Sequence, residues 1–281
     1  MNKLIEKRHL NPTVTLFTFE APLIAKKAEP GQFVILRPNE NSERIPLTIA
    51  DFDREKGTVT VIVQIVGGTT ADLNAIPEGE FIHDVAGPLG KATETDGLKK
   101  VAVVGGGVGC AIAYPIAKKL TKLGASVDFI VGFRNKDLVF LEEEFTAASD
   151  KLVIMTDDGS YGEKGLVTDA LKKLIEDGAN YDEVIAIGPL IMMKFVCKLT
   201  KEYGIKTIVS MNPIMIDGTG MCGGCRITVG GKMKFACVDG PDFDAHQVDF
   251  DTLLKRAAFY KEEQDKAAQH ICRMTGGKRN G

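Results

Sequence analysis

The chain has no tryptophan, few aromatic residues (7%) and no strong excess of charge of either sign. Its 281 residues include 35 lysines and arginines against 38 aspartates and glutamates, which gives a net charge of -3. This balance argues against a nucleic-acid-binding protein, which usually has a basic domain. No stretch approaches the ~18 consecutive apolar residues of a membrane span, and the charged N-terminal segment lacks the apolar core of a signal peptide. We therefore expect a soluble, cytoplasmic protein that binds neither nucleic acid nor membranes.

Histidine and cysteine are also scarce, with four and six residues. The histidines are scattered and offer no acid–base or metal constellation. In a long chain without an export signal, clustered cysteines more often bind a metal than form disulfides. Three cysteines are clustered in this way: Cys222, Cys225 and Cys237. The other three stand alone, and we expect each to be a small buried apolar side chain: Cys110, Cys197 and Cys272.

The length favours two domains with a short appendage, at ~100–200 residues per domain. Residues 1–97 contain short runs of Val, Ile, Thr and Phe bounded by turn residues. Such closely spaced strands, with little helical periodicity, are typical of a small antiparallel β-barrel. The predicted strands are 13–19, 32–37, 46–52 and 58–66.

Residues 98–210 change the pattern, because short apolar strands alternate with segments of helical length and composition. This alternation predicts an α/β domain with a parallel sheet covered on both faces. Residues 211–281 break the alternation with a glycine-rich, cysteine-bearing loop and an amphipathic helix over 250–274. The predicted strands of the α/β domain are 101–104, 127–131, 152–156, 183–187 and 206–209, and its clearest helices are 111–123 and 166–177.

The sequence VAVVGGGVGCA at 101–111 predicts a buried strand, a glycine-rich turn and a helix. Glycines allow a tight turn and let phosphate oxygens approach N–H groups at a helix N-terminus. A turn that merely needs glycine is the alternative, because the spacing only approximates G-x-G-x-x-G. Ligands of such domains gather at the carboxyl ends of the strands. The candidate nucleotide contacts are therefore Gly105, Gly106, Gly107, Val108, Gly109, Asp157, Asp158, Gly188 and Pro189.

Two motifs in the barrel segment also suit phosphate. Arg44 precedes a predicted strand and could offer its guanidinium fork to a phosphate. Gly67, Gly68, Thr69 and Thr70 open a predicted short helix whose free N–H groups and hydroxyls could hold a pyrophosphate. Each motif alone is commonplace. Their combination with the sequence AGPLG at 86–90 and a following nucleotide domain is specific.

These motifs resemble those of the ferredoxin–NADP reductase-like flavoproteins over essentially the whole chain. RIPLT at 44–48 is similar to their R-x-[PY]-[LS]-[ST] flavin signature, 67–70 to the pyrophosphate loop, and 188–192 to the G-P-x-x-M turn near the nicotinamide. The resemblance implies FAD between the barrel and the α/β domain, with NAD(H) entering across the cleft. NADP(H) stays open as an alternative, because Arg134 could contact a 2′-phosphate. The resemblance adds these flavin or nucleotide contacts: Pro46, Leu47, Thr48 (at the isoalloxazine ring), Gln64, Gly87 and Met192.

The loop at 217–237 reads DGTGMCGGCRITVGGKMKFAC, or D-x4-C-x2-C-x11-C. Plant-type [2Fe–2S] proteins use C-x4-C-x2-C with a distant fourth cysteine. The second, third and fourth ligand positions are thus Cys222, Cys225 and Cys237. A zinc site and free thiols are the alternatives for this loop.

Asp217 precedes Cys222-x2-Cys225 with four residues between, where the plant-type pattern requires the first thiolate. A carboxylate carries the same charge as a thiolate, so we predict that Asp217 is the first ligand. The alternative is an Asx-turn residue ahead of a glycine, in which case Asp239 or a water would be the next candidate.

A C-terminal [2Fe–2S] loop on this type of chain resembles the electron-transfer subunits of dihydroorotate dehydrogenase type B. The aspartate departs from their four-cysteine pattern and is similar instead to the small subunits of electron-bifurcating NADH-dependent ferredoxin:NADP oxidoreductases, also called sulfide dehydrogenases. The resemblance implies electron transfer between NAD(H), FAD and a [2Fe–2S] cluster. It also implies a heterodimer with a larger flavin and [4Fe–4S] subunit that serves ferredoxin. A stand-alone flavin reductase and a zinc-bearing regulatory module without redox chemistry are the alternatives.

Overall fold

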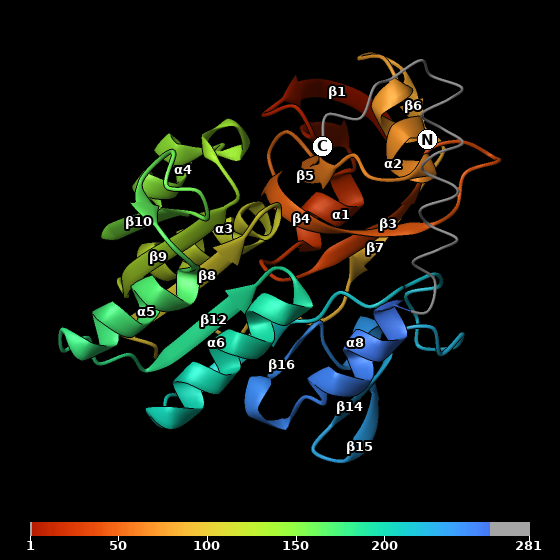
Figure 1. Cartoon of the computed structure of the whole chain (residues 1–281). Helices are drawn as coiled ribbons and strands as arrows, with labels where there is room; N and C mark the ends of the chain where they lie inside the picture. Colours follow the sequence, from red (N-terminus) through yellow and green to blue (C-terminus); the bar gives the residue numbers. More distant parts are fainter. Residues whose placement is uncertain (1, 259–281) are drawn as a thin grey trace.

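The structure, a computed structural model, describes residues 2–258. Seven antiparallel strands of the N-terminal part form one sheet in the order β6-β1-β2-β5-β4-β3-β7. The two end strands, β6 and β7, are separated by His83 alone, so the sheet curls round on itself into a barrel (Figure 1). Its elements are β1 (Asn2–His9), β2 (Val14–Glu20), α1 (Pro22–Lys27), β3 (Phe33–Arg37), β4 (Ile45–Asp53), β5 (Thr58–Gln64), α2 (Gly68–Ala75), β6 (Phe81–Ile82) and β7 (Asp84–Leu89).

Alternating side chains of these strands fill the barrel. Phe17 and Phe19 on β2 and Val59 and Val61 on β5 are fully buried in one cluster. These residues are two apart, which puts them on the same face of their strands. The predicted antiparallel barrel is therefore confirmed.

The second sheet has the order β11-β10-β9-β8-β12-β13-β16. All neighbours are parallel except β16, which runs antiparallel to β13. The chain starts in the middle of this sheet at β8 and builds outward in both directions, so β8 and β12 flank a topological switch point. The elements are β8 (Lys100–Gly106), α3 (Gly109–Lys122), β9 (Ser126–Phe133), η1 (Lys136–Leu138), α4 (Glu142–Ala147), β10 (Lys151–Thr156), β11 (Glu163–Lys164), α5 (Val167–Glu176), β12 (Glu183–Ile187), α6 (Leu190–Glu202) and β13 (Thr207–Ser210).

The α/β prediction is confirmed, with one correction: the sheet is mixed. Its edge strand β16 comes from the C-terminal part, so the proposed boundary at residue 210 divides segments that share a sheet. The predicted helix over 250–274 begins at Phe250 as α8, and its portion beyond Ala258, with Cys272, lies outside the described residues. The C-terminal elements are β14 (Arg226–Val229), β15 (Lys232–Phe235), α7 (Ala236–Asp239), β16 (Asp242–Asp244), η2 (Ala245–Gln247) and α8 (Phe250–Ala258).

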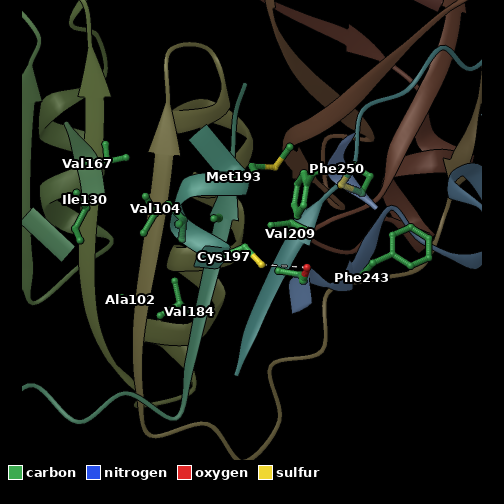
Figure 2. Close-up of a cluster of buried hydrophobic side chains, with 14 of the residues drawn as sticks. Ala102, Val104, Ile130, Val167, Val184, Met193, Cys197, Val209, Phe243 and Phe250 are labelled. Carbon is green, nitrogen blue, oxygen red and sulfur yellow. Dashed lines mark hydrogen bonds between the residues drawn. The ribbon is translucent and has the colours of Figure 1, made fainter. Parts of the chain in front are cut away.

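One buried cluster joins the α/β domain to the cysteine loop. Figure 2 shows Met193 and Cys197 of α6 facing Val209, with Phe243 and Phe250 beyond them. Cys225 and Cys237 belong to the same cluster, as do Phe33 and Ile35 of the barrel. The loop therefore packs against both domains. No helix within residues 2–258 has the length and apolar character needed to cross a bilayer.

Candidate cofactor sites

The glycine-rich turn after β8 opens onto free space at the switch point. Gly107 has a φ of +56°, and a Cβ on it would meet no atom within 4 Å. Its N–H donates to the Gly132 carbonyl at 2.9 Å, which holds the turn on β9. α3 follows directly, and the N–H groups of a first helical turn have no intrahelical acceptor. The turn thus presents donors and the positive end of a helix dipole to an open face, as a phosphate requires.

The neighbouring glycines are needed for close packing. A Cβ on Gly106 would lie 2.4 Å from the Met192 sulfur, and one on Gly188 would lie 2.9 Å from the Met192 methyl. A Cβ on Gly109 would lie 2.4 Å from the carbonyl oxygen of Ile187. The structure therefore brings the two predicted glycine motifs together. Close packing explains glycine at these three positions and the positive φ explains it at Gly107, so a turn that needs glycine accounts for all four; the open space beside Gly107 is the additional feature that suits a nucleotide.

Asp157 and Asp158 are exposed after β10, beside Arg134 at the end of β9. Asp158 accepts hydrogen bonds from the backbone N–H and hydroxyl of Ser160, at 2.9 and 2.6 Å, which lower the pKa of its carboxyl group. The Arg134 carbonyl accepts from the Asp158 N–H at 3.3 Å. The predicted aspartates thus stand at the carboxyl end of the sheet, with one carboxylate already capping its own turn.

The flavin motif of the barrel lies on β4, where Pro46, Leu47 and Thr48 are half-buried and pair with β3. Gln64 is exposed at the end of β5. Gly87 sits on β7, where a Cβ would lie 2.8 Å from Val34, so strand packing alone accounts for this glycine.

The turn before α2 uses one of the predicted ligand groups itself. The Thr70 hydroxyl accepts from the N–H groups of Val66 and Gly67, both at 3.0 Å, and donates to the Gly67 carbonyl at 2.9 Å. Three internal hydrogen bonds leave this hydroxyl little capacity for a pyrophosphate. The N–H groups of Gly68 and Thr69 at the start of α2 remain suited to the task.

Of the candidate ligands in the cysteine loop, Cys225 and Cys237 are buried, Asp217 is half-buried and Cys222 is exposed. The sulfurs of buried Cys225 and Cys237 are 3.2 Å apart. Burial, and then the Cys225 neighbour, raise the pKa of the Cys237 thiol to about 11. Cys222 is exposed, and the backbone N–H of Gly224 lowers the pKa of its thiol. Within residues 2–258 no three His, Cys, Asp or Glu side chains converge on one point, as they would around a single metal ion. A binuclear cluster does not require such a point, because its ligands are divided between two irons.

Asp217 forms an Asx turn. Its Oδ2 accepts from the Thr219 hydroxyl at 2.6 Å, the Thr219 N–H at 3.1 Å and the Met221 N–H at 3.2 Å. These bonds, led by that of the Thr219 hydroxyl, lower the pKa of the carboxyl group, so it is ionised at neutral pH. The other candidate carboxylate, Asp239, accepts from the Phe235 N–H at 2.7 Å and lies 3.8 Å from the Lys234 amine. Asp239 is thus engaged by the residues that immediately precede its own helix α7.

Arg44 makes a contact that sequence reasoning did not predict. Its Nε donates to the carbonyl of Ile216 at 2.9 Å, across 172 positions of the chain. Close by, a Cβ on Gly218 (φ +82°) would lie 2.8 Å from both Ile35 and Leu89. The segment that carries Asp217 is therefore held against strands β3 and β7 of the barrel, and no local sequence signal could have revealed this.

Comparison with known proteins agrees with this geometry. Residues 212–249 match the family model for the iron–sulfur cluster binding domain of dihydroorotate dehydrogenase B. The dihydroorotate dehydrogenase B (NAD(+)), electron transfer subunit homolog of Thermotoga maritima is 46% identical, over 98% of this chain and 97% of that protein. The chain belongs to the dihydroorotate dehydrogenase B electron-transfer subunit family. The electron-transfer subunit of this enzyme from Fusobacterium nucleatum is 36% identical, over 79% of this chain and 87% of that protein.

Solved structures also match this chain. A chain of the NADH-dependent reduced ferredoxin-NADP oxidoreductase structure, studied for flavin-based electron bifurcation, is 45% identical, with a TM-score of 0.91 over 96% of this chain and 98% of that chain. The cytochrome P450 reductase of Amycolatopsis is only 20% identical, with a TM-score of 0.60, and shares the fold alone. The family resemblance, the reductase-like fold and the iron–sulfur loop predicted from the sequence are confirmed.

Proposed function

We propose that the chain is the NADH-oxidising, electron-transfer subunit of a cytoplasmic electron-bifurcating NADH-dependent ferredoxin:NADP oxidoreductase. The observation that carries the proposal is that a loop with four candidate cluster ligands packs directly on the barrel that bears the flavin motif. When bound, FAD would exchange a hydride with the nicotinamide and single electrons with a [2Fe–2S] cluster, so two-electron and one-electron chemistry meet in one chain.

The turn after β8 holds the nucleotide. The N–H groups around Gly107 and the start of α3 bind the pyrophosphate, and Gly188, Pro189 and Met192 shape the nicotinamide end. Exposed carboxylates at Asp157 and Asp158 favour NAD(H), because they can accept from a ribose hydroxyl but repel a 2′-phosphate. Arg134, which follows β9, supports the alternative, NADP(H).

The barrel holds the flavin. The guanidinium of Arg44 and the N–H groups at the start of α2 neutralise and orient the pyrophosphate of FAD. Thr48 on β4 offers a hydroxyl to the isoalloxazine ring. Arg44 lies next to the loop that carries the cysteines, because its Nε donates to the Ile216 carbonyl.

The loop holds the cluster through Asp217, Cys222, Cys225 and Cys237. The short Cys225–Cys237 distance supports an assignment of these two residues to one iron, which leaves Asp217 and Cys222 for the other. Backbone groups of Gly224 and Asp217 lower the pKa of the Cys222 thiol, and backbone donors of this kind tune the potential of iron–sulfur clusters.

A larger partner subunit completes the activity. The described cysteines outside the loop, Cys110 and Cys197, are buried in helices, so this chain offers no ligand set for a [4Fe–4S] cluster within residues 2–258. We place the second flavin, the [4Fe–4S] clusters and the ferredoxin contact in that partner. The second candidate function is that of the electron-transfer subunit of dihydroorotate dehydrogenase B, which is supported by the match of residues 212–249. Asp217, in place of a cysteine, favours the bifurcating complex.

The test is metal, sulfide and flavin analysis of the chain expressed with its partner, with electron paramagnetic resonance of the reduced protein. Alanine at Cys222, Cys225 or Cys237 should abolish or strongly reduce iron content, whereas alanine at Cys110 or Cys197 should not. Asp217→Cys should keep the cluster but change its potential and resonance signal, because oxygen is a harder and less covalent ligand than sulfur. An unaltered signal in Asp217→Ala would remove Asp217 from the ligand set, and zinc in place of iron would refute the proposal.

A further inference from the structure

Arg44 of the barrel holds the cysteine loop with one edge of its guanidinium. Its Nε is engaged by the Ile216 carbonyl at 2.9 Å, and its Nη atoms form no hydrogen bond within residues 2–258. Asp84, a barrel carboxylate that senses the charge of Arg44, is already paired with Arg37 at 2.6 Å. A guanidinium is a planar group whose donors point in different directions. One edge of Arg44 can therefore hold the loop while the other binds an anion.

The loop segment held by Arg44 carries Asp217 and leads to Cys222. Ile216 immediately precedes Asp217, whose carboxylate accepts from the Thr219 hydroxyl and from the N–H groups of Thr219 and of Met221, the residue before Cys222. Gly218 lies against the barrel, where a Cβ would come within 2.8 Å of both Ile35 and Leu89. A displacement of the Ile216 carbonyl would thus move Asp217 and, through these hydrogen bonds, the segment that leads to Cys222.

From this geometry we infer that Arg44 is a positioning residue that couples flavin occupancy to the iron–sulfur loop. The inference rests on the proposed function, in which Arg44 meets the pyrophosphate of FAD and Asp217 with Cys222 binds one iron. A bound pyrophosphate fixes the exposed guanidinium in one orientation and so fixes the carbonyl of Ile216. Because coupling between two binding sites is reciprocal, the assembled cluster must raise FAD affinity by the same factor.

Lysine at position 44 separates the two roles. Its ammonium can remain near a phosphate as a point charge, but it lacks a rigid fork that serves two partners in fixed directions. We expect Arg44→Lys to bind FAD more weakly yet measurably, and to lose the coupling. Arg37→Lys is the matched control: Arg37 is an arginine of the same sheet that is paired with Asp84, and within residues 2–258 it makes no hydrogen bond to the loop.

The experiment uses the full chain with its partner, before FAD removal, after it, and after FAD is added back. The readouts are the resonance signal and midpoint potential of the cluster, and the FAD dissociation constant with and without the cluster. In the wild type and Arg37→Lys, FAD removal should shift the cluster signal reversibly, and cluster loss should weaken FAD binding at least about 5-fold, the low end of typical coupling. In Arg44→Lys and Arg44→Ala both effects should vanish.

Two results would overturn the inference, and they differ. Wild-type protein that holds no flavin or no iron would refute the proposed function and this inference with it. Flavin and iron in the wild type, with equal FAD-dependent shifts in Arg44→Lys and Arg37→Lys, would refute the coupling role of Arg44 alone.

Discussion

Gly107→Ala tests the nucleotide site with little damage to the fold. The position is left-handed, with a φ of +56°, so an alanine there costs roughly 1–2 kcal/mol of backbone strain. The new methyl group meets no protein atom within 4 Å, so there is no packing penalty to add. Against a typical stability of about 5–15 kcal/mol, the variant should stay folded.

The same methyl group projects into the space where the pyrophosphate should approach the backbone. Loss of a hydrogen bond to a charged group costs about 1.5–3 kcal/mol, which corresponds to a rise of roughly 10- to 150-fold in the dissociation constant for NADH. The flavin spectrum should not change, because no barrel residue is touched. The measurement is an anaerobic NADH titration of flavin reduction, followed by absorbance.

Gly124→Ala is the control for backbone strain. Gly124 also has a positive φ, +85°, and open space around its Cβ position. It lies between α3 and β9, however, at the amino ends of the strands, away from the turn after β8. Its alanine variant should lose similar stability and bind NADH normally. If the two variants bind NADH equally well, the nucleotide does not bind at the turn after β8.

Two further variants test the neighbouring structure. Gly109→Ala would place a Cβ 2.4 Å from the Ile187 carbonyl oxygen and 2.8 Å from Gly188, and because these are backbone atoms we expect about 1–3 kcal/mol of destabilisation; an unchanged melting temperature would contradict this packing. The Oδ1 atom of Asp242 is enclosed and has no partner among the described residues, although other atoms of the residue are partly exposed. Burial raises the pKa of the Asp242 carboxyl group from 3.8 to about 6. The folded state favours the protonated carboxyl group, so protonation adds to the free energy of unfolding. This contribution is fully present below pH 3.8 and is lost as the pH rises through about 6, a loss of about 3 kcal/mol at 1.36 kcal/mol per pH unit. Asp242→Asn should remove this contribution to the pH dependence, and denaturant midpoints at pH 5 and pH 7.5 that differ as in the wild type would refute the assignment.

The strands that could be predicted are those with a repeating apolar face. β5 and β8 to β10 are rich in Val and Ile, β2 is rich in Thr and Phe, and local pattern located them within a few residues. β1 was missed because its sequence, NKLIEKRH, has only Leu4 buried, β6 because it has only two residues, and β7 because it contains Gly87 and Pro88. β16 has only three residues, and its pairing with β13 joins parts of the chain that local patterns cannot relate.

The candidate sites, too, could be predicted from the sequence only in part. The glycine turns could be predicted, because tight turns and phosphate cradles need glycine at fixed offsets. Which glycine faces packing and which faces open space could not, since that depends on Met192 and Ile187 from other elements. Thr70 shows a related limit, because a hydroxyl suited to a phosphate is equally suited to capping its own helix.

Asp217 shows why two interpretations of one residue need not compete. The spacing before Cys222 predicts a ligand, whereas the hydrogen bonds from Thr219 and Met221 identify an Asx turn. Both requirements can be met by one carboxylate, because a ligating carboxylate is normally held by hydrogen bonds that orient it and keep it ionised. The Asx turn lowers the pKa of Asp217 and directs the Oδ2 bonds into the loop. A cysteine at this position could not accept such a set of short, charge-assisted bonds, so the aspartate contributes to the shape of the loop as well as offering an oxygen to iron.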